Sequence, residues 1–433
     1  MNYQPLITII MPSLNVADYI EECLNSVCNQ TLKDIEILCI DAKSDDGTME
    51  IISRFADEDS RVRLILSEKR SYGYQVNLGL SIAKGTYVAI LETDDYVEYD
   101  MYERLYEATE EEQYDYVKCD YKAYWTQKDG ERLFYNRKSM SDKKSYGQQI
   151  YPTDTLQLSL DDWFLWNGIY RKAFLDKYNI HLQETPGAAY QDIGFLCQIN
   201  MFAKKACYID NALYCYCLDR DGASSNSGKG LRYAYGEYNN ILQHPKVKQN
   251  KAAERNIYIR MSKSVSSIID NTMDGNAALG DEDVKLMFEW FGRRLEYAGN
   301  EGYISQEIIG REFWENINLL RGPYEEFVNA VVDRNKALSE FVENHKNIFI
   351  FGCGHYGYRA YKWIMANDCS LMAFSDNNEK LWNTYIDGIK VVKPNELPQN
   401  DEAGVIIANA SAFVQIKNQL IELGISRDNI LVW

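Results

Sequence analysis

Three carboxylates stand close together directly after an apolar segment, in the order Glu92-Thr93-Asp94-Asp95. Like charges at this spacing repel one another, and a bound cation relieves that repulsion. Carboxylates combined with substrate phosphates are a recurrent ligand set for Mg²⁺ and Mn²⁺. We therefore predict a divalent metal site, Mn²⁺ or Mg²⁺, held by Asp95 and Asp94. The alternative is a solvated acidic turn, in which screening weakens the repulsion.

Polar residues also follow the first two apolar segments of the chain. Ser13 and Asn15 come after the first segment, and Asp41 ends the second. Taken singly, Ser13 and Asn15 are ordinary turn and helix-cap residues. In a parallel α/β sheet, however, the carboxyl ends of the strands face one crevice, where ligands bind. The sequence therefore predicts a nucleotide-binding pocket made by Pro12, Ser13, Asn15, Asp41 and Asp94.

The elements that position these residues alternate between strand and helix over the first 120 residues. Residues 17–29, for example, place Ile20, Cys23, Leu24 and Val27 on one face of a helix. Such alternation predicts an α/β fold with a parallel sheet. Strands are expected at 6–11, 36–40, 63–66, 87–91 and 115–119, and helices at 17–29, 48–56, 74–83 and 101–111.

The remainder of the chain has two further patterns. Residues 231–343 read as helical, and alternation resumes at 345–433. There, Gly352-x-Gly354-x-x-Gly357 follows a predicted strand at 347–351 and opens a helix, which is the context of a dinucleotide-binding turn. Asp376 lies 24 residues beyond Gly352, close to the position of a ribose-binding acid.

Composition restricts the class of protein. A chain of 433 residues predicts two or three domains. The net charge of −18 argues against nucleic acid or an anionic membrane as the main partner. We find no apolar run of 18 residues, no signal-peptide pattern, no CxxC pair and only four His. We therefore expect a cytoplasmic protein without a transmembrane segment, and leave open peripheral association with the inner face of the membrane.

The stretch 7–121 resembles the N-terminal half of the family 2 glycosyltransferases, which have the glycosyltransferase-A fold. A second block, extending to residue 225, resembles the acceptor half of the same family. Both blocks together cover about half of the chain. The matching segments are Pro12-Ser13-Leu14-Asn15, Ser26 to Gln30, Asp41 to Thr48, Asn77-Leu78-Gly79, Lys84 to Tyr87, Glu92 to Asp95, Trp166 to Lys172, and Tyr190 to Phe195.

The resemblance implies metal-dependent, inverting transfer of a sugar from a nucleotide-sugar donor, most simply a UDP-sugar, to a hydroxyl of a glycan or glycolipid. It also implies that Asp192 is the general base. The alternative role of Asp192 is the N-cap of a helix that begins at Ile193. Trp166, Asn167 and Tyr190 would line the acceptor site, although Trp166 could equally fill the core.

The chain departs from the family pattern at three positions. Ala42 stands where the family usually has a second acid after the second strand, so Asp41 or the backbone must contact the base. Gln191 precedes Asp192 where Glu is common. Glu92 leads the acidic turn in place of Asp. Lys69 and Arg70 are cationic and near the expected diphosphate, but a solvated basic pair explains them equally well.

The C-terminal part resembles the small Rossmann-like domains appended to some bacterial carbohydrate enzymes. We therefore expect a glycosyltransferase-A catalytic domain at 1–228, a helical segment at 229–344 and a Rossmann-like domain at 345–433. Two alternatives stay open: an inactive sugar- or nucleotide-binding scaffold, and an NAD(P)-linked sugar-nucleotide enzyme that acts through the C-terminal domain. Homo-oligomerisation is also left open.

Overall fold

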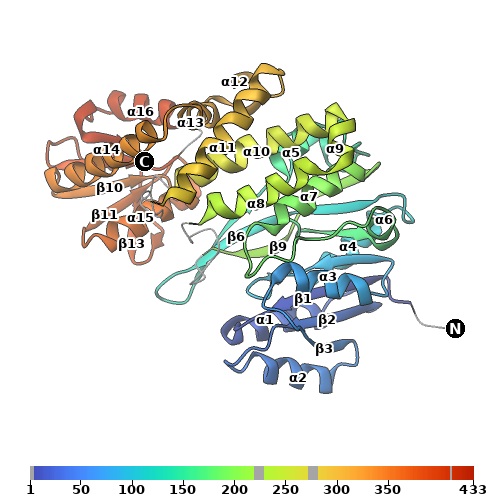
Figure 1. Cartoon of the computed structure of the whole chain (residues 1–433). Helices are drawn as coiled ribbons and strands as arrows, with labels where there is room; N and C mark the ends of the chain where they lie inside the picture. Colours follow the sequence, from blue (N-terminus) through green and yellow to red (C-terminus); the bar gives the residue numbers. More distant parts are fainter. Residues whose placement is uncertain (1–3, 219–228, 272–280, 410–411) are drawn as a thin grey trace. The chain divides into compact units, whose positions relative to one another are not determined.

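The computed structural model describes residues 4–218, 229–271, 281–409 and 412–433. They fall into two compact units (Figure 1). The first comprises Met1–Tyr124, Asn136–Asn271 and Asn276–Gly322, and the second contains Trp125–Tyr135 and Pro323–Trp433. The predicted domain boundary at residue 228 lies outside the described residues. Over the described ranges, no helix is both long and apolar enough to cross a bilayer.

The first unit is built on a sheet in which the predicted parallel strands lie side by side, in the order β3-β2-β1-β4. Parallel pairing aligns Ser13 with Asp41, so the polar residues that end β1 and β2 are neighbours. Strands β1, β2 and β4 are wholly buried, which matches their mainly apolar sequence. Their bounds are β1 Ile7–Ser13, β2 Ile35–Asp41, β3 Val62–Leu66 and β4 Tyr87–Ile90.

Beyond β4 the sheet is mixed, which differs from the parallel continuation that the sequence predicts. β8 lies between β4 and β6 and runs antiparallel to both. β6 and β9 are long and pair in parallel, while β5 pairs antiparallel with β9. The second half of the sheet therefore comes back to the acidic turn after β4. The bounds are β5 Tyr96–Val97, β6 Tyr116–Thr126, β7 Arg132–Arg137, β8 Gly168–Arg171 and β9 Ala206–Cys217.

Helices of the first half pack by close contact with the sheet. α1 buries Ile20, Cys23, Leu24 and Val27, the face that the sequence predicts. In α3, Gly79 lies so close to β1 that a Cβ atom there would be 2.6 Å from Ile10. The bounds are α1 Ala17–Cys28, α2 Thr48–Glu58, α3 Tyr72–Ile82 and α4 Met101–Glu107.

Most of the helical segment that we predict at 229–344 belongs to the first unit. α8 packs on α7, and α10 packs on α5 and α8. The reason is that these helices, for example α8 and α11, each have an apolar face, and packing on neighbouring helices buries it. The bounds are α5 Gln157–Asp161, α6 Lys172–Tyr178, α7 Gln191–Phe202, α8 Gly230–Gln243, α9 Pro245–Gln249, α10 Lys251–Asn271, α11 Glu282–Asn300, α12 Gln306–Ile309 and α13 Arg311–Arg321.

The second unit contains a sheet with the strand order β12-β13-β11-β10-β14-β15. All its pairs are parallel except β12 with β13. Residues 125–135 belong to this unit, where Trp125 stacks on Tyr358 with ring centroids 4.3 Å apart. The bounds are β10 Asn347–Phe351, β11 Leu371–Ser375, β12 Tyr385–Ile386, β13 Ile389–Val392, β14 Ala403–Ile407, β15 Ile430–Val432, α14 Tyr324–Asn344, α15 His355–Ala366 and α16 Phe413–Glu422.

The contact between α3 and β1 gives a testable prediction. Gly79→Ala should destabilise the protein by about 1–3 kcal/mol, because the added methyl group overpacks against Ile10. Gly236→Ala, in α8, is the matched control, since a Cβ there meets no atom within 4 Å. That control should be neutral or stabilising by up to about 1 kcal/mol. Denaturant unfolding of the two variants measures the difference, and equal stabilities would contradict the close packing.

Candidate functional site

A cluster of hydrogen bonds organises the ends of β1 and β2. The buried carboxylate of Asp41 accepts hydrogen bonds from the hydroxyls of Ser13 and Ser44, both at 2.8 Å. The Ser44 hydroxyl in turn accepts a hydrogen bond from the Asn15 backbone N–H at 2.8 Å. Three of the predicted nucleotide-binding residues are therefore brought together, but Ser13 and Asp41 are enclosed, whereas Asn15 is exposed.

Two further hydrogen bonds connect this cluster to the neighbouring elements. The Gln75 amide, from α3, donates to the carbonyl oxygens of Ser13 and Ile40 at 2.8 and 2.6 Å. The Thr93 hydroxyl, from the acidic turn, donates to the carbonyl oxygen of Pro12 at 3.0 Å. The acidic turn is therefore fixed beside the end of β1, where Pro12 and Ser13 lie.

The two aspartates of the acidic turn have different surroundings. Asp95 is buried, and its carboxylate accepts hydrogen bonds from the Tyr214 hydroxyl and the Cys217 backbone N–H, each at 2.7 Å. Burial, together with the negative charge of Asp94, raises the pKa of Asp95 well above its usual range. Asp94 is only half-buried. Each Asp95 oxygen accepts one hydrogen bond from β9, and the role of Asp95 as a metal ligand stays a prediction.

The acidic turn suits a metal only if a ligand supplies additional oxygens. Within the described part of the chain, no group of three or more His, Cys, Asp or Glu side chains is arranged to hold a metal ion. Mg²⁺ and Mn²⁺ do not need such a group, since one or two carboxylates plus phosphate oxygens suffice. The negative charges of Asp94 and Glu92 disfavour the ionised form of Asp95, and a bound cation would offset this repulsion. The residues present therefore fit a divalent cation.

Tyr72 connects the acidic turn to the segment before α7. Its hydroxyl donates a hydrogen bond to the Glu92 carboxylate, and its backbone N–H donates to the carbonyl oxygen of Gly187 at 3.0 Å. Burial raises the pKa of Tyr72, and the negative charges of Glu92, Asp192 and Asp94 raise it further. Residues of the acidic turn and the predicted base thus all raise the pKa of the Tyr72 hydroxyl. Sequence reasoning missed Tyr72, because no local pattern distinguishes it from other helix-start tyrosines.

Asp192 lies in the first turn of α7. Tyr190, with a left-handed φ of 66°, is the N-cap residue, so the predicted N-cap role of Asp192 is wrong. The Asp192 carboxylate accepts a hydrogen bond from the Ile193 N–H at 3.0 Å. Burial raises its pKa to about 6, opposed by that N–H and by the charges of Arg260 and Lys118. A carboxylate with this pKa can both exist ionised and accept a proton near neutral pH.

A buried group of charged side chains lies near Asp192. Lys118 of β6 forms an ion pair with Asp162 at 2.5 Å, and neither side chain is exposed by more than 1%. Arg260 of α10 donates hydrogen bonds to the carbonyl oxygens of Asp162 and Leu158. These cations limit the rise in the pKa of Asp192, as noted above. Helix α10 therefore contributes to the electrostatics of the candidate site, which the sequence does not indicate.

The predicted acceptor residues lie mostly in the interior. Trp166 is buried and stacks on Tyr214 with ring centroids 4.0 Å apart. Asn167 is also buried, and its amide donates to the Cys119 carbonyl oxygen at 2.7 Å. Trp166 therefore fills the core, which is the alternative given for it above, and Asn167 is buried there as well. Of the three residues, only Tyr190 is half-buried.

The structure shows the contacts of the residues that differ from the family pattern and of the basic pair Lys69 and Arg70. Ala42 is buried, whereas Lys43 is exposed with a left-handed φ of 62°. Lys69 forms an ion pair with Glu184 at 2.7 Å, and the Arg70 guanidinium donates to the Lys43 carbonyl oxygen at 3.3 Å. Gln191 accepts a hydrogen bond from the Ala189 N–H at 2.7 Å and donates to the Thr185 hydroxyl. Gln191 therefore orders the turn that precedes Asp192.

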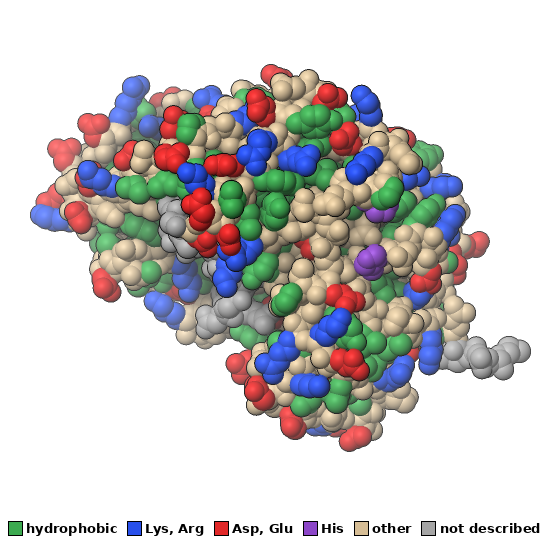
Figure 2. Space-filling model, viewed as in Figure 1, with side chains coloured by type: hydrophobic (Ala, Val, Ile, Leu, Met, Phe, Trp, Pro, Cys, Tyr) green, Lys and Arg blue, Asp and Glu red, His purple; other side chains and the backbone are tan. Residues whose placement is uncertain are grey.

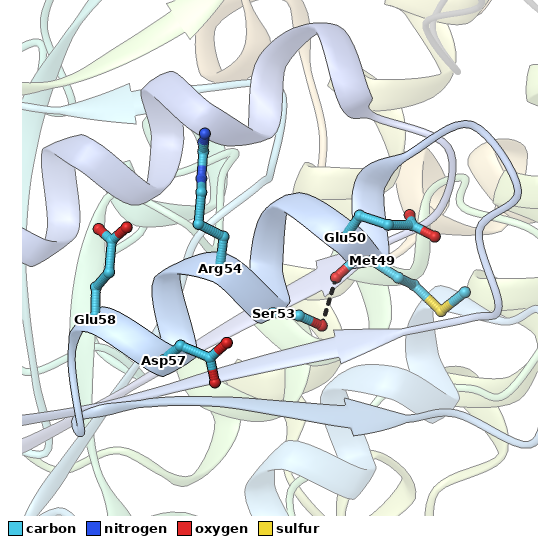
Figure 3. A pocket seen from close by; sticks show the side chains of 6 residues that line it. All are labelled: Met49, Glu50, Ser53, Arg54, Asp57 and Glu58. Carbon is cyan, nitrogen blue, oxygen red and sulfur yellow. Dashed lines mark hydrogen bonds between the residues drawn. The ribbon is translucent and has the colours of Figure 1, made fainter.

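Two surface features lie outside the β1–β2 cluster and the acidic turn. Acidic and basic side chains are interspersed over the face shown in Figure 2, without a large region of one sign. A shallow depression runs along α2 (Figure 3) and is lined by side chains of that helix alone. A one-sided surface of this kind cannot enclose a nucleotide. Its lining residues are Met49, Glu50, Ser53, Arg54, Asp57 and Glu58.

Two family models match this chain. The model of Glycosyl transferase family 2 matches residues 8–178, which include the ends of β1 and β2 and the acidic turn. A second model, described as C2185-like, N-terminal, matches residues 344–431 in the second compact unit. The predicted Rossmann-like assignment of this second region is not confirmed by that match.

Curated relatives and solved structures agree with the first match. The chain is 30% identical to the uncharacterized glycosyltransferase EpsJ of Bacillus subtilis over 215 residues, covering 49% of this chain and 61% of EpsJ. It is 27% identical to the glycosyltransferase GlyG of Streptococcus pneumoniae, covering 49% of this chain and 70% of GlyG. The chain thus spans somewhat less than two thirds of EpsJ.

A crystal structure of residues 1–349 of TarS from S. aureus, in complex with UDP-GlcNAc, has a TM-score of 0.55 at 16% identity. The match covers 77% of this chain and 90% of that structure. Such low identity supports the fold alone, and it confirms the predicted α/β, glycosyltransferase-A-like architecture. Residues 8–178 of this chain are therefore similar to the domain of glycosyl transferase family 2.

Proposed function

We propose that this chain is a metal-dependent, inverting glycosyltransferase that moves a sugar from a nucleotide-sugar donor, a UDP-sugar in the simplest case, to a hydroxyl of a glycan or glycolipid. The observation that carries the proposal is the convergence on Tyr72 of Glu92 and Asp94 from the acidic turn and Asp192 from α7. The matched family and the UDP-GlcNAc bound by TarS support a nucleotide sugar as donor. We propose that it acts in the cytoplasm.

The donor end of the proposed site combines the β1–β2 cluster with the acidic turn. Asn15 is exposed beside the enclosed pair Ser13 and Asp41 and can contact a nucleotide, while Pro12 shapes the backbone next to Thr93. We propose Asp94 as the protein ligand of Mn²⁺ or Mg²⁺, because it is less enclosed than Asp95. When bound, the cation would supply positive charge against the leaving diphosphate.

The acceptor end of the proposed site is formed around Asp192. The acceptor oxygen attacks the anomeric carbon and forms the new glycosidic bond. Its proton passes to the Asp192 carboxylate, and the bond from the anomeric carbon to the diphosphate oxygen breaks with its electron pair. A base on the side of the sugar opposite to the leaving group gives inversion in a single displacement. Tyr190 is the predicted acceptor residue that we retain, because it is half-buried.

For the second unit we propose a Rossmann-like packing domain rather than an NAD(P) site. The parallel order β13-β11-β10-β14-β15 supports the Rossmann-like assignment. At the glycine-rich turn, however, the Cys353 N–H donates to the Asp376 carboxylate at 2.8 Å, and the Tyr135 hydroxyl donates to the Cys353 carbonyl oxygen. The groups that would meet a dinucleotide therefore bind one another.

This assignment predicts that NAD⁺ or NADPH leaves the melting temperature unchanged, whereas UDP with Mn²⁺ raises it. Ligand binding to the folded state alone stabilises it by mass action, about 2.7 kcal/mol at one hundred times Kd. Thermal shift of the full chain with each ligand measures both. A shift with NAD(P) that is lost in Asp376→Ala would restore the dinucleotide alternative.

Asp192→Asn tests the proposed base. The amide keeps the size of the side chain but cannot accept the proton, so transfer should fall on the order of 10²–10⁴-fold. UDP affinity, measured by calorimetry, should be unchanged. In the wild type, kcat/KM should fall as the pH drops below about 6, where Asp192 becomes protonated. The matched control is Asp176→Asn, an exposed aspartate at the end of α6. Weaker UDP binding with intact kcat would contradict the role.

Asp94→Ala and Asp95→Ala should separate the two aspartates of the turn. Asp94→Ala should abolish the gain in UDP affinity from Mn²⁺. Asp95→Ala should instead destabilise the fold, because the Tyr214 hydroxyl and Cys217 N–H lose their acceptor, at about 1–3 kcal/mol for each buried group. Calorimetry with Mn²⁺ or EDTA, together with unfolding curves, distinguishes the roles. Metal-enhanced binding that survives in Asp94→Ala would refute our choice of ligand.

A further inference from the structure

A carboxyl group is buried where the helical segment packs on α7. Glu237 lies on the face of α8 that also buries Ala234, Tyr238 and Ile241, and its exposure is 2%. Among the described residues, its Oε2 atom has no hydrogen-bond partner. A polar group in an otherwise apolar helix face is costly, so its presence calls for an explanation.

The Glu237 carboxyl is aimed at the first turn of α7. A Cβ atom built on Gly194 would lie 2.3 Å from Glu237 Oε2, so a methyl group there would require the Glu237 carboxyl to shift. Gly194 is two residues beyond Asp192, in the same helical turn. α8 and α7 are also in extensive contact. Glu237 therefore packs directly on the backbone that carries the proposed base.

Within the described part of the chain, Glu237 forms no ion pair with a charged side chain. From α7, Asp192 adds negative charge that raises the pKa of Glu237, and the Cys197 thiol interacts with it. From α10, the Arg260 guanidinium hydrogen-bonds to backbone carbonyl oxygens. Hydrogen bonding by Gln183 and by the Gly194 N–H lowers the pKa of Glu237. Burial has the larger effect and raises this pKa to about 8.

We propose that Glu237 is a positioning residue for Asp192: its carboxyl, carrying a proton, fills the space above Gly194 and fixes the first turn of α7. This inference rests on the proposed role of Asp192 as base. The neutral carboxyl adds no charge beside Asp192, whereas ionised Glu237 would be a second buried anion there. Loss of its proton therefore drives the side chain out of its place and disturbs α7. Activity has an upper pH limit for this reason.

The sign of the stability effect follows from linkage. A group whose pKa rises from 4.5 to about 8 on folding stabilises the folded state most at low pH, and this stabilisation is lost as the pH rises between those values. Gln has nearly the shape of the protonated acid but cannot ionise. Glu237→Gln should therefore gain melting temperature relative to the wild type as the pH rises from about 5 to about 8.

The first experiment measures melting temperature and nucleotide-sugar hydrolysis against pH for the full chain. Glu237→Gln should show the growing stability difference and should keep its rate above pH 8, where the wild-type rate falls. The matched control is Glu282→Gln, an exposed glutamate at the start of α11, which should follow the wild type in both measurements. A melting difference that is independent of pH would overturn the proposal, and this readout requires no knowledge of the donor.

The second experiment uses the contact with Gly194. Gly194→Ala pushes Glu237 aside and should lower kcat on the order of 10²-fold, with UDP affinity retained, because small displacements of a base are costly. Glu237→Ala creates a space that the new methyl group partly fills. The double variant should therefore recover part of the activity that Gly194→Ala loses, and additive losses would overturn the contact.

The two proposals can fail separately. If Asp192→Asn keeps its activity, the proposed base is wrong, and only the stability part of the inference concerning Glu237 is left. If Asp192→Asn is inactive while Glu237→Gln matches the wild type at every pH, the base is correct and the positioning role of Glu237 is wrong.

Discussion

Carboxylates enclosed at one edge of the sheet are the constraint on which the rest of the first unit depends. A buried carboxylate is costly unless its oxygens accept hydrogen bonds. Asp41 accepts hydrogen bonds from the hydroxyls of Ser13, at the end of β1, and Ser44, in the turn after β2, and Asp95 from a hydroxyl and an N–H of β9. Segments far apart in sequence must therefore meet at this edge. The mixed second half of the sheet is what brings β9 there.

The same constraint gives chemically identical side chains different properties. Asp94 and Asp95 are adjacent in sequence, yet one is half-buried and the other has both oxygens bound by β9. Asp192 is half-buried near Arg260 and Lys118, and its pKa is about 6, whereas burial raises the pKa of Glu237 to about 8. Environments that separate the pKa values of carboxyl groups are typical of sites with distinct acid and base roles.

The helical segment and residues 125–135 both belong to units that the linear order of the chain does not suggest. α8 and α10 complete the surroundings of α7, so this part of the chain supplies Glu237 and Arg260 to the neighbourhood of Asp192. Residues 125–135, which interrupt the first unit in sequence, provide Trp125 and Tyr135 to the second. There the Tyr135 hydroxyl binds the glycine-rich turn.

The sequence by itself determined the elements whose signals are local. Unbroken apolar strands and helical spacing predicted β1 to β4 and α1, and ordered motifs predicted the family and the residues at strand ends. Only the tertiary structure decided which acid is enclosed, because burial depends on β9, more than a hundred residues away from Asp95. The same holds for Tyr72 and Glu237. Their importance lies in contacts between separate elements, and such contacts leave no periodicity or spacing in the chain.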